Sequence, residues 1–375
     1  MDFDWAAEER EIYNQIYSRT KLWPAPDSGF FTPAEWKLCA SLGLLGLSVP
    51  KRYGGEGYGF LATARAAEAF GRGAPDMGLV FSAMAHLFAC AMPIVEHGDE
   101  EMRREILPRL TSGEWVGANA ITEEEAGSDA TRLATRAEKA GADYVLTGEK
   151  CFVSNGPAAD VFVVYAMSHP DLGYLGVSAF VLERGTPGLV VGPPFGKLGL
   201  DRCPASTVRL DGCVVPARRR LGGEGQGAAI FQAAMRWERT CLFAAYAGRI
   251  ERLAERCAQH ARERQQFGRP IGTNQAISHR LARMRVRLDA ARLLLWRACW
   301  RLDKDEPASA DVAMAKLAIS EAAAESAMDA VRIFGGDGIR TDRGVECELR
   351  DAVPSVIFSG TSEMQLELIV RELGL

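Results

Sequence analysis

The spacing of apolar residues changes twice along the chain. Up to about residue 112, apolar residues recur every three or four positions, which predicts helices. From about 115 to 221 they alternate with polar residues, and Gly, Pro and Asp separate the runs, which predicts β-strands. The runs interpreted as strands are residues 144–147, 161–165 and 177–182.

Helical spacing returns after the glycine-rich segment 222–227. Three long helical stretches follow, over residues 228–266, 274–302 and 308–334. Helices of that length pack as a bundle. The pattern therefore predicts an α+β protein with three parts: an N-terminal helical domain (1–114), a central β domain (115–225) and a C-terminal helical bundle (226–375). Because no βαβ alternation occurs, a Rossmann fold is disfavoured, and segment 222–227 is interpreted as a linker.

Composition narrows the class of protein. Nearly half of the 375 residues are apolar, enough for a large core. The nine cysteines and five histidines are dispersed, so neither a metal site nor a disulfide framework is predicted. A net charge of −5 argues against a general nucleic-acid binder. Segment Met1–Arg10 is acidic and amphipathic, unlike a secretory signal, and no apolar run is expected to span a membrane, so a cytoplasmic protein is predicted.

Two polar loops suggest a binding site for a flat, polar heterocycle. The first, residues 120–129, ends in small side chains that let backbone N–H groups approach a ligand, and it offers two hydroxyls. The second, residues 148–156, carries an aromatic and a hydroxyl side chain on alternate strand positions. The residues with these properties are Thr122, Ala126, Gly127, Ser128, Phe152 and Ser154. Either loop alone is typical of a turn, but the two in this order indicate a flavin.

Four later segments extend the pattern. They are Trp237–Arg239, residues 264–271 with Gln275, residues 334–338 and residues 357–363. Together with the two loops, they resemble the acyl-CoA dehydrogenase family across essentially the whole chain. The resemblance implies an N-terminal helical domain, a central β domain of barrel or sandwich type and a C-terminal four-helix bundle. It also implies a homo-oligomer, usually a tetramer, with one FAD per subunit.

The resemblance assigns the cofactor contacts. The flavin ring would be met by Ile121, Thr122, Gly127, Ser128, Phe152 and Ser154. The pyrophosphate and adenine of a neighbouring subunit's FAD would be held by Arg264, Phe267, Ile271, Gln275, Gly335 and Gly336. Arg332, Thr361 and Glu363 complete the predicted cofactor set. A planar guanidinium suits a diphosphate, although an exposed helical Arg and a Gly–Gly helix cap are the ordinary alternatives.

The catalytic base is displaced from its usual place. Removing the α proton of a thioester requires a carboxylate, which many family members carry immediately before the Gly-Thr of the last motif. Ser359 stands there and cannot be that base. The family's second location implies Glu238, beside Arg239, whose apolar neighbours predict a pKa raised towards neutrality. The resemblance further implies that the Ser359 backbone N–H polarises the thioester carbonyl and that Arg239 lies on the substrate side.

Several stretches resemble a narrower branch of the family. Residues 76–81, 88–95, 237–244 and 357–361 are similar to the flavin-dependent dehydrogenases of L-prolyl carrier proteins in pyrrole natural-product pathways. That similarity implies oxidation of an L-prolyl thioester on a peptidyl carrier protein to pyrrole-2-carboxyl. The electron acceptor, oxygen or an electron-transfer flavoprotein, stays open. The chain departs from the family at Glu124 (usually Pro), Phe152 (often Trp) and Arg332 (often Gln).

Two other functions are compatible with the motifs. An acyl-CoA dehydrogenase for short or branched chains would use the same base, since CoA and carrier proteins share the pantetheine arm. A non-catalytic flavin or carrier-binding module is the alternative of another class, suggested by Ser359 and opposed by Glu238. A carrier-dependent enzyme needs a docking patch, for which Arg218, Arg219 and Arg220 are candidates, although a solvated charge run is the more ordinary interpretation.

Overall fold

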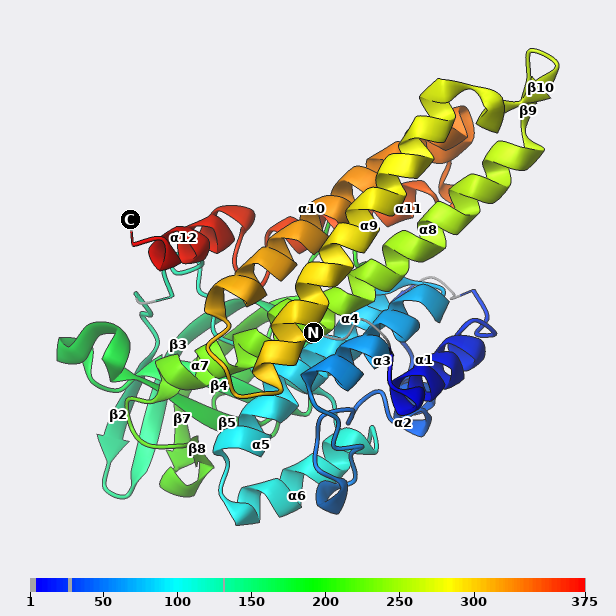
Figure 1. The fold of residues 1–375 in the computed structure, drawn as a ribbon. Helices are drawn as coiled ribbons and strands as arrows, with labels where there is room; N and C mark the ends of the chain where they lie inside the picture. Colours follow the sequence, from blue (N-terminus) through cyan, green and yellow to red (C-terminus); the bar gives the residue numbers. More distant parts are fainter. Residues whose placement is uncertain (1–4, 26–28, 131, 375) are drawn as a thin grey trace.

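The computed structural model describes residues 5–25, 29–130 and 132–374. Helices come first, a β-sheet domain follows, and helices return (Figure 1). The predicted α+β order of helical, β and helical parts is confirmed. The first four residues of the acidic N-terminal segment lie outside the described residues.

Among its described residues, the N-terminal part has six α-helices. They are α1 (Ala7–Thr20), α2 (Pro33–Ser41), α3 (Phe60–Gly73), α4 (Met77–Ala85), α5 (Met92–His97) and α6 (Glu100–Thr111). Local signals set where they begin: Thr32 and Glu35 form a reciprocal capping box at α2, and Asp76 caps α4. The carboxylates and hydroxyl satisfy backbone N–H groups that a helix start leaves unpaired.

Helix α4 continues through a π-helical turn, η2 (His86–Ala91), into α5. The 21-residue helix Met77–His97 is apolar and long enough to cross a membrane, so the expectation that no run reaches that length is wrong. Within the protein, 89% of its most apolar window is buried. It is therefore a core helix, and its apolar character is explained by packing on all sides.

The β domain contains eight strands of one sheet. They are β1 (Gly117–Ala120), β2 (Arg136–Ala140), β3 (Asp143–Ser154), β4 (Val161–Met167), β5 (Val177–Glu183), β6 (Leu189–Val191), β7 (Ala205–Pro216) and β8 (Arg220–Leu221). The order is β6-β7-β3-β2-β4-β5-β8, with β1 parallel to β4. Strand β4 is buried throughout, because Val161, Val163 and Tyr165 face the helical core while Phe162 and Val164 face the core of the sheet domain.

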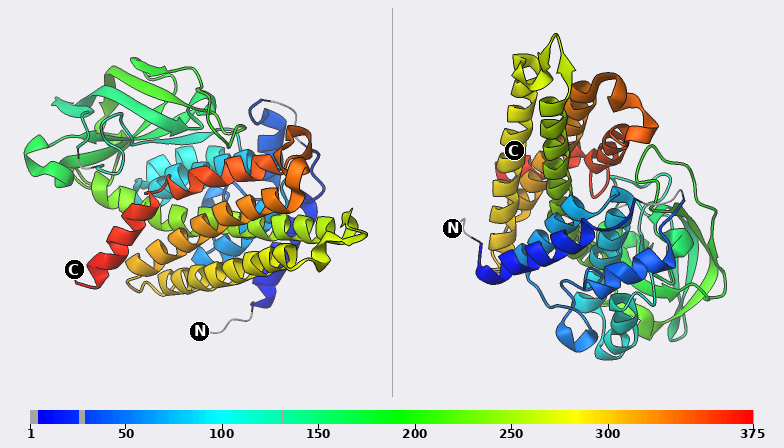
Figure 2. Two further views of the ribbon diagram at one scale, coloured as in Figure 1. Left: turned by 90° about the horizontal axis from the view of Figure 1, so that it is seen from above. Right: turned by 90° about the vertical axis from the view of Figure 1, so that its right-hand side faces the viewer.

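The C-terminal part is built on long helices. They are α7 (Gly227–Trp237), α8 (Phe243–Glu263), α9 (Gln275–Leu302) and α10 (Ser309–Phe334), followed by α11 (Glu346–Ala352) and α12 (Ser362–Glu372). A small hairpin of β9 (Gln265–Gln266) and β10 (Arg269–Pro270) joins α8 to α9. Both ribbon views place this hairpin at the end of the long helices farthest from the β domain (Figures 1 and 2). The three helices predicted over 228–334 are confirmed.

Candidate active site

The predicted base, Glu238, lies in a distorted part of a continuous helix. Helix α7 runs into a π-helical turn, η6 (Glu238–Leu242), and then into α8. Such turns are rare and occur frequently at functional sites. The two consecutive residues Glu238 and Arg239 lie in this turn, and both reach the same partner, Ser359.

Glu238 is a buried carboxylate with one short hydrogen bond. Only 9% of its surface is exposed, and the Ser359 hydroxyl donates to Glu238 Oε2 at 2.6 Å. Burial raises the pKa of Glu238 to about 7, while the Ser359 hydrogen bond and the charge of Arg239 act in the lowering direction. The predicted rise of this pKa towards neutrality is confirmed. Its role as a base stays a prediction at this point.

Stacked aromatic rings hold Trp237, the residue that precedes Glu238. Trp237 stacks on Phe60 with ring centroids 3.6 Å apart, and Phe88 lies parallel to it at 6.1 Å. The indole N–H of Trp237 donates to Glu96 Oε1 at 2.7 Å, which fixes the ring.

The loop that carries Ser359 is held in an uncommon conformation. Ser359 has a φ of 55° and Gly360 a φ of 90°. Arg239 Nε donates to the Ser359 carbonyl at 2.8 Å, and Gln365 Nε2 donates to the Gly360 carbonyl at 2.9 Å. Behind the loop, the Phe358 ring packs on Phe81 at 4.9 Å. Arg239 thus orients this loop; its expected position on the substrate side stays a prediction.

The first predicted flavin loop is anchored by a buried ion pair. Lys150, fully buried on β3, donates to Glu123 Oε1 at 2.6 Å and to the Ile121 carbonyl at 3.1 Å. Glu123 also accepts the backbone N–H groups of Ala134 and Thr135. Desolvation lowers the pKa of Lys150 to about 8, against the opposing pull of Glu123. The pair fixes the backbone on both sides of Thr122.

Replacing Lys150 by Met should destabilise the protein. The change keeps the volume of the side chain but leaves Glu123 as a buried charge without its cation, which costs about 3 kcal/mol. Urea denaturation at neutral pH measures this loss of unfolding free energy. The double variant Lys150→Met, Glu123→Gln is the control and should recover part of it; equal stability of the single variant and the parent protein would contradict a stabilising role for the pair.

The residues assigned to the flavin ring lie around this anchored loop. Phe152 is 69% exposed and meets Phe195 edge-on, with ring centroids 5.4 Å apart. A Cβ added at Gly127 would meet no atom within 4 Å. Ile121, Thr122 and Ser154 are half-buried and Ser128 is exposed. An exposed aromatic ring beside open backbone is compatible with a planar ligand held against this edge of the β domain.

A second group of predicted cofactor residues lies at the hairpin. Phe267 is 96% exposed with a φ of 54°, and Arg264 and Gln275 are exposed while Ile271 is buried. Within the described residues, no carboxylate pairs with Arg264. Gly335 caps α10 with a φ of 59°, and a Cβ at Gly335 or Gly336 would meet nothing within 4 Å. These groups fit a diphosphate ligand, because a free guanidinium and open glycine backbone can both approach it.

The two groups cannot meet within one chain. The helix from Glu238 to Arg264 rises roughly 39 Å, so the hairpin lies far from the β domain, as Figure 1 shows. Thr361 and Glu363 lie at the start of α12 near Lys316 of α10, at the Glu238 end, whereas Arg332, Gly335 and Gly336 lie at the hairpin end. This separation is compatible with the prediction that a neighbouring chain contributes the second group.

The run Arg218–Arg220 offers little free positive charge. Arg219 pairs with Glu105 and Glu183, and Arg220 donates to the Tyr144 hydroxyl. Arg218 is exposed. Two members of the run are thus occupied within the chain, which favours the interpretation as a solvated charge run over a docking patch.

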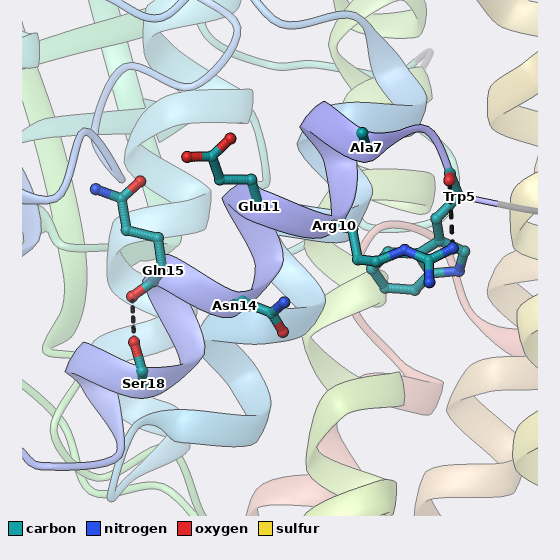
Figure 3. A pocket seen from close by; sticks show the side chains of 7 residues that line it. All are labelled: Trp5, Ala7, Arg10, Glu11, Asn14, Gln15 and Ser18. Carbon is teal, nitrogen blue, oxygen red and sulfur yellow. Dashed lines mark hydrogen bonds between the residues drawn. The ribbon is translucent and has the colours of Figure 1, made fainter.

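A surface groove of about 700 Å³ lies along the outer side of α1 (Figure 3). Its walls are formed by Trp5, Ala7, Arg10, Glu11, Asn14, Gln15 and Ser18. None of the residues predicted to bind the cofactor or the substrate lines it. The groove therefore has no part in the candidate site.

Several residues of the site carry little or no signal in the sequence. The Lys150–Glu123 pair could have been suspected, because Lys150 falls on the inward-facing parity of β3 shared with Tyr144 and Leu146. The roles of Gln365 and of the Ser359 hydroxyl gave no such signal. Their partners are distant in sequence, and only the folded chain brings them together.

Comparison with known proteins gives matches over most of the chain. Residues 13–114, 118–213 and 225–374 match the N-terminal, middle and C-terminal domain models of acyl-CoA dehydrogenases. An L-prolyl-[peptidyl-carrier protein] dehydrogenase of Pseudomonas fluorescens is 55% identical over 349 residues, covering 93% of this chain and 92% of that protein.

Two solved structures resemble the whole fold. PigA with FAD and proline superposes with a TM-score of 0.97 at 41% identity, over 100% of both chains. The prolyl acyl carrier protein oxidase AnaB superposes with a TM-score of 0.96 at 38% identity, covering 99% of this chain and 100% of that one.

Proposed function

The chain belongs to the acyl-CoA dehydrogenase family, and from this premise we propose that it oxidises the L-prolyl thioester of a peptidyl carrier protein to the pyrrole-2-carboxyl thioester. It is an FAD-dependent oxidoreductase. Two relatives of high similarity carry the name of this activity. A cytoplasmic location stays a prediction.

One observation supports the chemistry above all others. Where many family members carry the base, this chain carries Ser359, and the carboxylate of Glu238 reaches that residue at 2.6 Å. The chain therefore supplies a carboxylate at nearly the same place from a different helix. With a pKa of about 7, Glu238 is half-ionised near neutral pH and can both accept and release a proton.

Different residues of the chain have different roles in the proposed reaction. FAD, held by residues such as Thr122, Ser154 and the neighbouring chain's Arg264, would supply the hydride acceptor for two successive two-electron oxidations. A proton would leave with each hydride, so four hydrogens would be removed in all. Glu238 takes the prolyl α proton. The Ser359 backbone N–H would donate to the thioester carbonyl and would stabilise the negative charge that develops there. A tautomerisation then completes the aromatic ring.

The complete site would be formed between two subunits. One chain would supply Glu238, Thr122 and Ser154, and its neighbour would supply Arg264 and Phe267 from the hairpin end of its long helices. The separation of the two ends within one chain supports a homo-oligomer, with a tetramer as the expected form. The carrier protein is the second partner, because it brings the thioester.

Anaerobic mixing tests the proposed function. The FAD-loaded protein is expected to lose its flavin absorbance with L-prolyl carrier protein, and the carrier should lose about 4 Da once an electron acceptor is admitted, since four hydrogens leave in two turnovers. Stopped-flow absorbance and mass spectrometry of the carrier measure both. Peroxide formed in air would identify oxygen as the acceptor.

Short and branched acyl-CoAs are the control substrates. Bleaching by acyl-CoA alone would replace the proposal by acyl-CoA oxidation. If neither substrate reduces the flavin of a protein that binds FAD, the result would support a non-catalytic binding module.

A further inference from the structure

We propose that the hydroxyl of Ser359 is a positioning group that orients the Glu238 carboxylate for proton removal. The inference deepens the proposed function and rests on it, because it takes Glu238 as the base. It gives the Ser359 side chain a role separate from that of its backbone N–H. Where many relatives carry a glutamate that reacts, this chain carries a hydroxyl that holds the reacting glutamate.

The geometry joins two successive residues to one partner. The Ser359 hydroxyl donates to Glu238 Oε2 at 2.6 Å, and the guanidinium of Arg239 donates to the Ser359 carbonyl at 2.8 Å. The π-helical turn η6 presents both side chains to Ser359. Arg239 therefore holds Ser359, and Ser359 holds Glu238, so the carboxylate is fixed from a loop that lies 121 positions further along the chain.

The backbone conformation of Ser359 suggests that the hydroxyl of this residue is needed. A φ of 55° is left-handed, where glycine is accommodated without a steric penalty and other residues are strained. Gly360 follows in the same region, so the loop already contains a residue suited to the turn. A serine at the strained position makes sense if its hydroxyl is needed, and the only hydrogen bond that this hydroxyl makes among the described residues is to Glu238.

Few other polar groups face Glu238. Arg239, on the same turn, favours its charged form. Tyr165 on β4 lies within electrostatic range, and burial keeps that phenol neutral by raising its pKa. Lys316 on α10 interacts electrostatically with Arg239 rather than with Glu238, and burial lowers the pKa of Lys316 to about 8. Tyr174, in the short 3-10 helix before β5, also interacts electrostatically with Arg239. Ser359 is thus the one group that donates a hydrogen bond to the carboxylate in the described part of the chain.

The test compares Ser359→Ala with Ser359→Gly in the FAD-loaded enzyme. Both remove the hydroxyl; Gly also relieves the backbone strain. In the parent protein, flavin reduction by L-prolyl carrier protein should rise with pH through about 7, as Glu238 ionises. In both variants the pH at which the rate of flavin reduction rises should increase by roughly one unit, because the ionised form of Glu238 loses a hydrogen bond. The rate at pH 6 should therefore fall roughly tenfold. The loss at pH 9 should be smaller.

Ser355→Ala is the matched control. Ser355 is a buried serine of the same segment whose hydroxyl donates to the Ala352 carbonyl, away from Glu238. Ser355→Ala should unfold at a lower urea concentration, but the pH at which its rate of flavin reduction rises should not change. A loss of rate in the Ser359 variants that is equal at every pH would overturn the proposal, since that result would mean a structural role only.

A second readout does not require turnover. The carboxyl band of Glu238 can be followed by infrared titration of the FAD-loaded protein, assigned by its loss in Glu238→Gln. A titration that moves upward in Ser359→Ala and Ser359→Gly supports the inference even if prolyl oxidation fails. An unmoved titration in an enzyme that does oxidise the prolyl thioester overturns the inference and leaves the proposed function intact.

Discussion

Replacing Glu238 by Gln is expected to leave a yellow, FAD-loaded protein whose flavin is no longer reduced by the L-prolyl thioester. The side chain keeps its shape and can still accept the hydrogen bond from Ser359, so packing is preserved. It can no longer accept the α proton. Loss of a general base of this kind costs about 10²- to 10⁴-fold in rate. Stopped-flow measurement of flavin reduction at pH 8 gives the number directly.

A carboxylate outside the site provides the control for this result. Glu105 pairs with Arg219 on the surface, so Glu105→Gln should reduce flavin at the parental rate. A Glu238→Gln protein that binds FAD and is reduced at a rate within about threefold of the parent would remove Glu238 from the mechanism.

The same substitution should also make the folded state more stable above neutral pH. The folded pKa of Glu238, about 7, lies above its ordinary value of 4.5, so the folded protein binds more protons than the unfolded chain between these pH values. Stability contributed by Glu238 is therefore present below about pH 4.5 and is lost as pH rises to 7. The free energy of unfolding lost over this pH range is about 3 kcal/mol at most. The amide introduced by Glu238→Gln has no proton to lose in this range, so the variant should not show this decline in urea midpoints.

Much of the fold was predictable because the relevant signals are local. The short apolar run 161–165 predicted strand β4, and the helical spacing over 274–302 predicted α9 almost to the residue. The apolar neighbours of Glu238 likewise indicated its raised pKa. By contrast, the general expectation that no apolar run reaches the length of a membrane span overlooked helix Met77–His97, and its burial inside the protein shows that it is a core helix.

What sequence could not predict depends on long-range contacts. Glu238 and Ser359 are separated by most of the C-terminal part, and nothing in either segment indicates that a hydroxyl would meet a carboxylate. The π-helical turn η6 has no composition that distinguishes it from ordinary helix. The pairing of Arg219 with two glutamates was equally invisible, so a run of three arginines suggested more free charge than the folded chain offers.

Two inactive variants should restore activity to each other when co-expressed. Arg264→Glu places a negative charge where the cofactor's diphosphate is expected, and as a homo-oligomer it should bind FAD roughly a hundredfold more weakly. Glu238→Gln binds FAD but lacks the base. In a mixed dimer, a site that takes Glu238 from one chain and Arg264 from the other has both groups. Random mixing should then give about a quarter of the parental activity. Distinct affinity tags allow the mixed species to be isolated and its flavin content and rate to be measured.

The outcome separates two arrangements of the cofactor site. If Arg264 acted on the site of its own chain, every mixed oligomer would remain inactive, and contribution by a neighbour would be excluded. Co-expressing Glu238→Gln with the double variant Glu238→Gln, Arg264→Glu is the negative control, because no site then has a base. Arg262, exposed on the last turn of α8, provides the matched charge reversal. Arg262→Glu is expected to retain FAD, because the prediction assigns the diphosphate to the Arg264 guanidinium and not to the general positive charge of the hairpin end. Loss of FAD in both variants would show that the charge of this region, not Arg264 itself, determines binding.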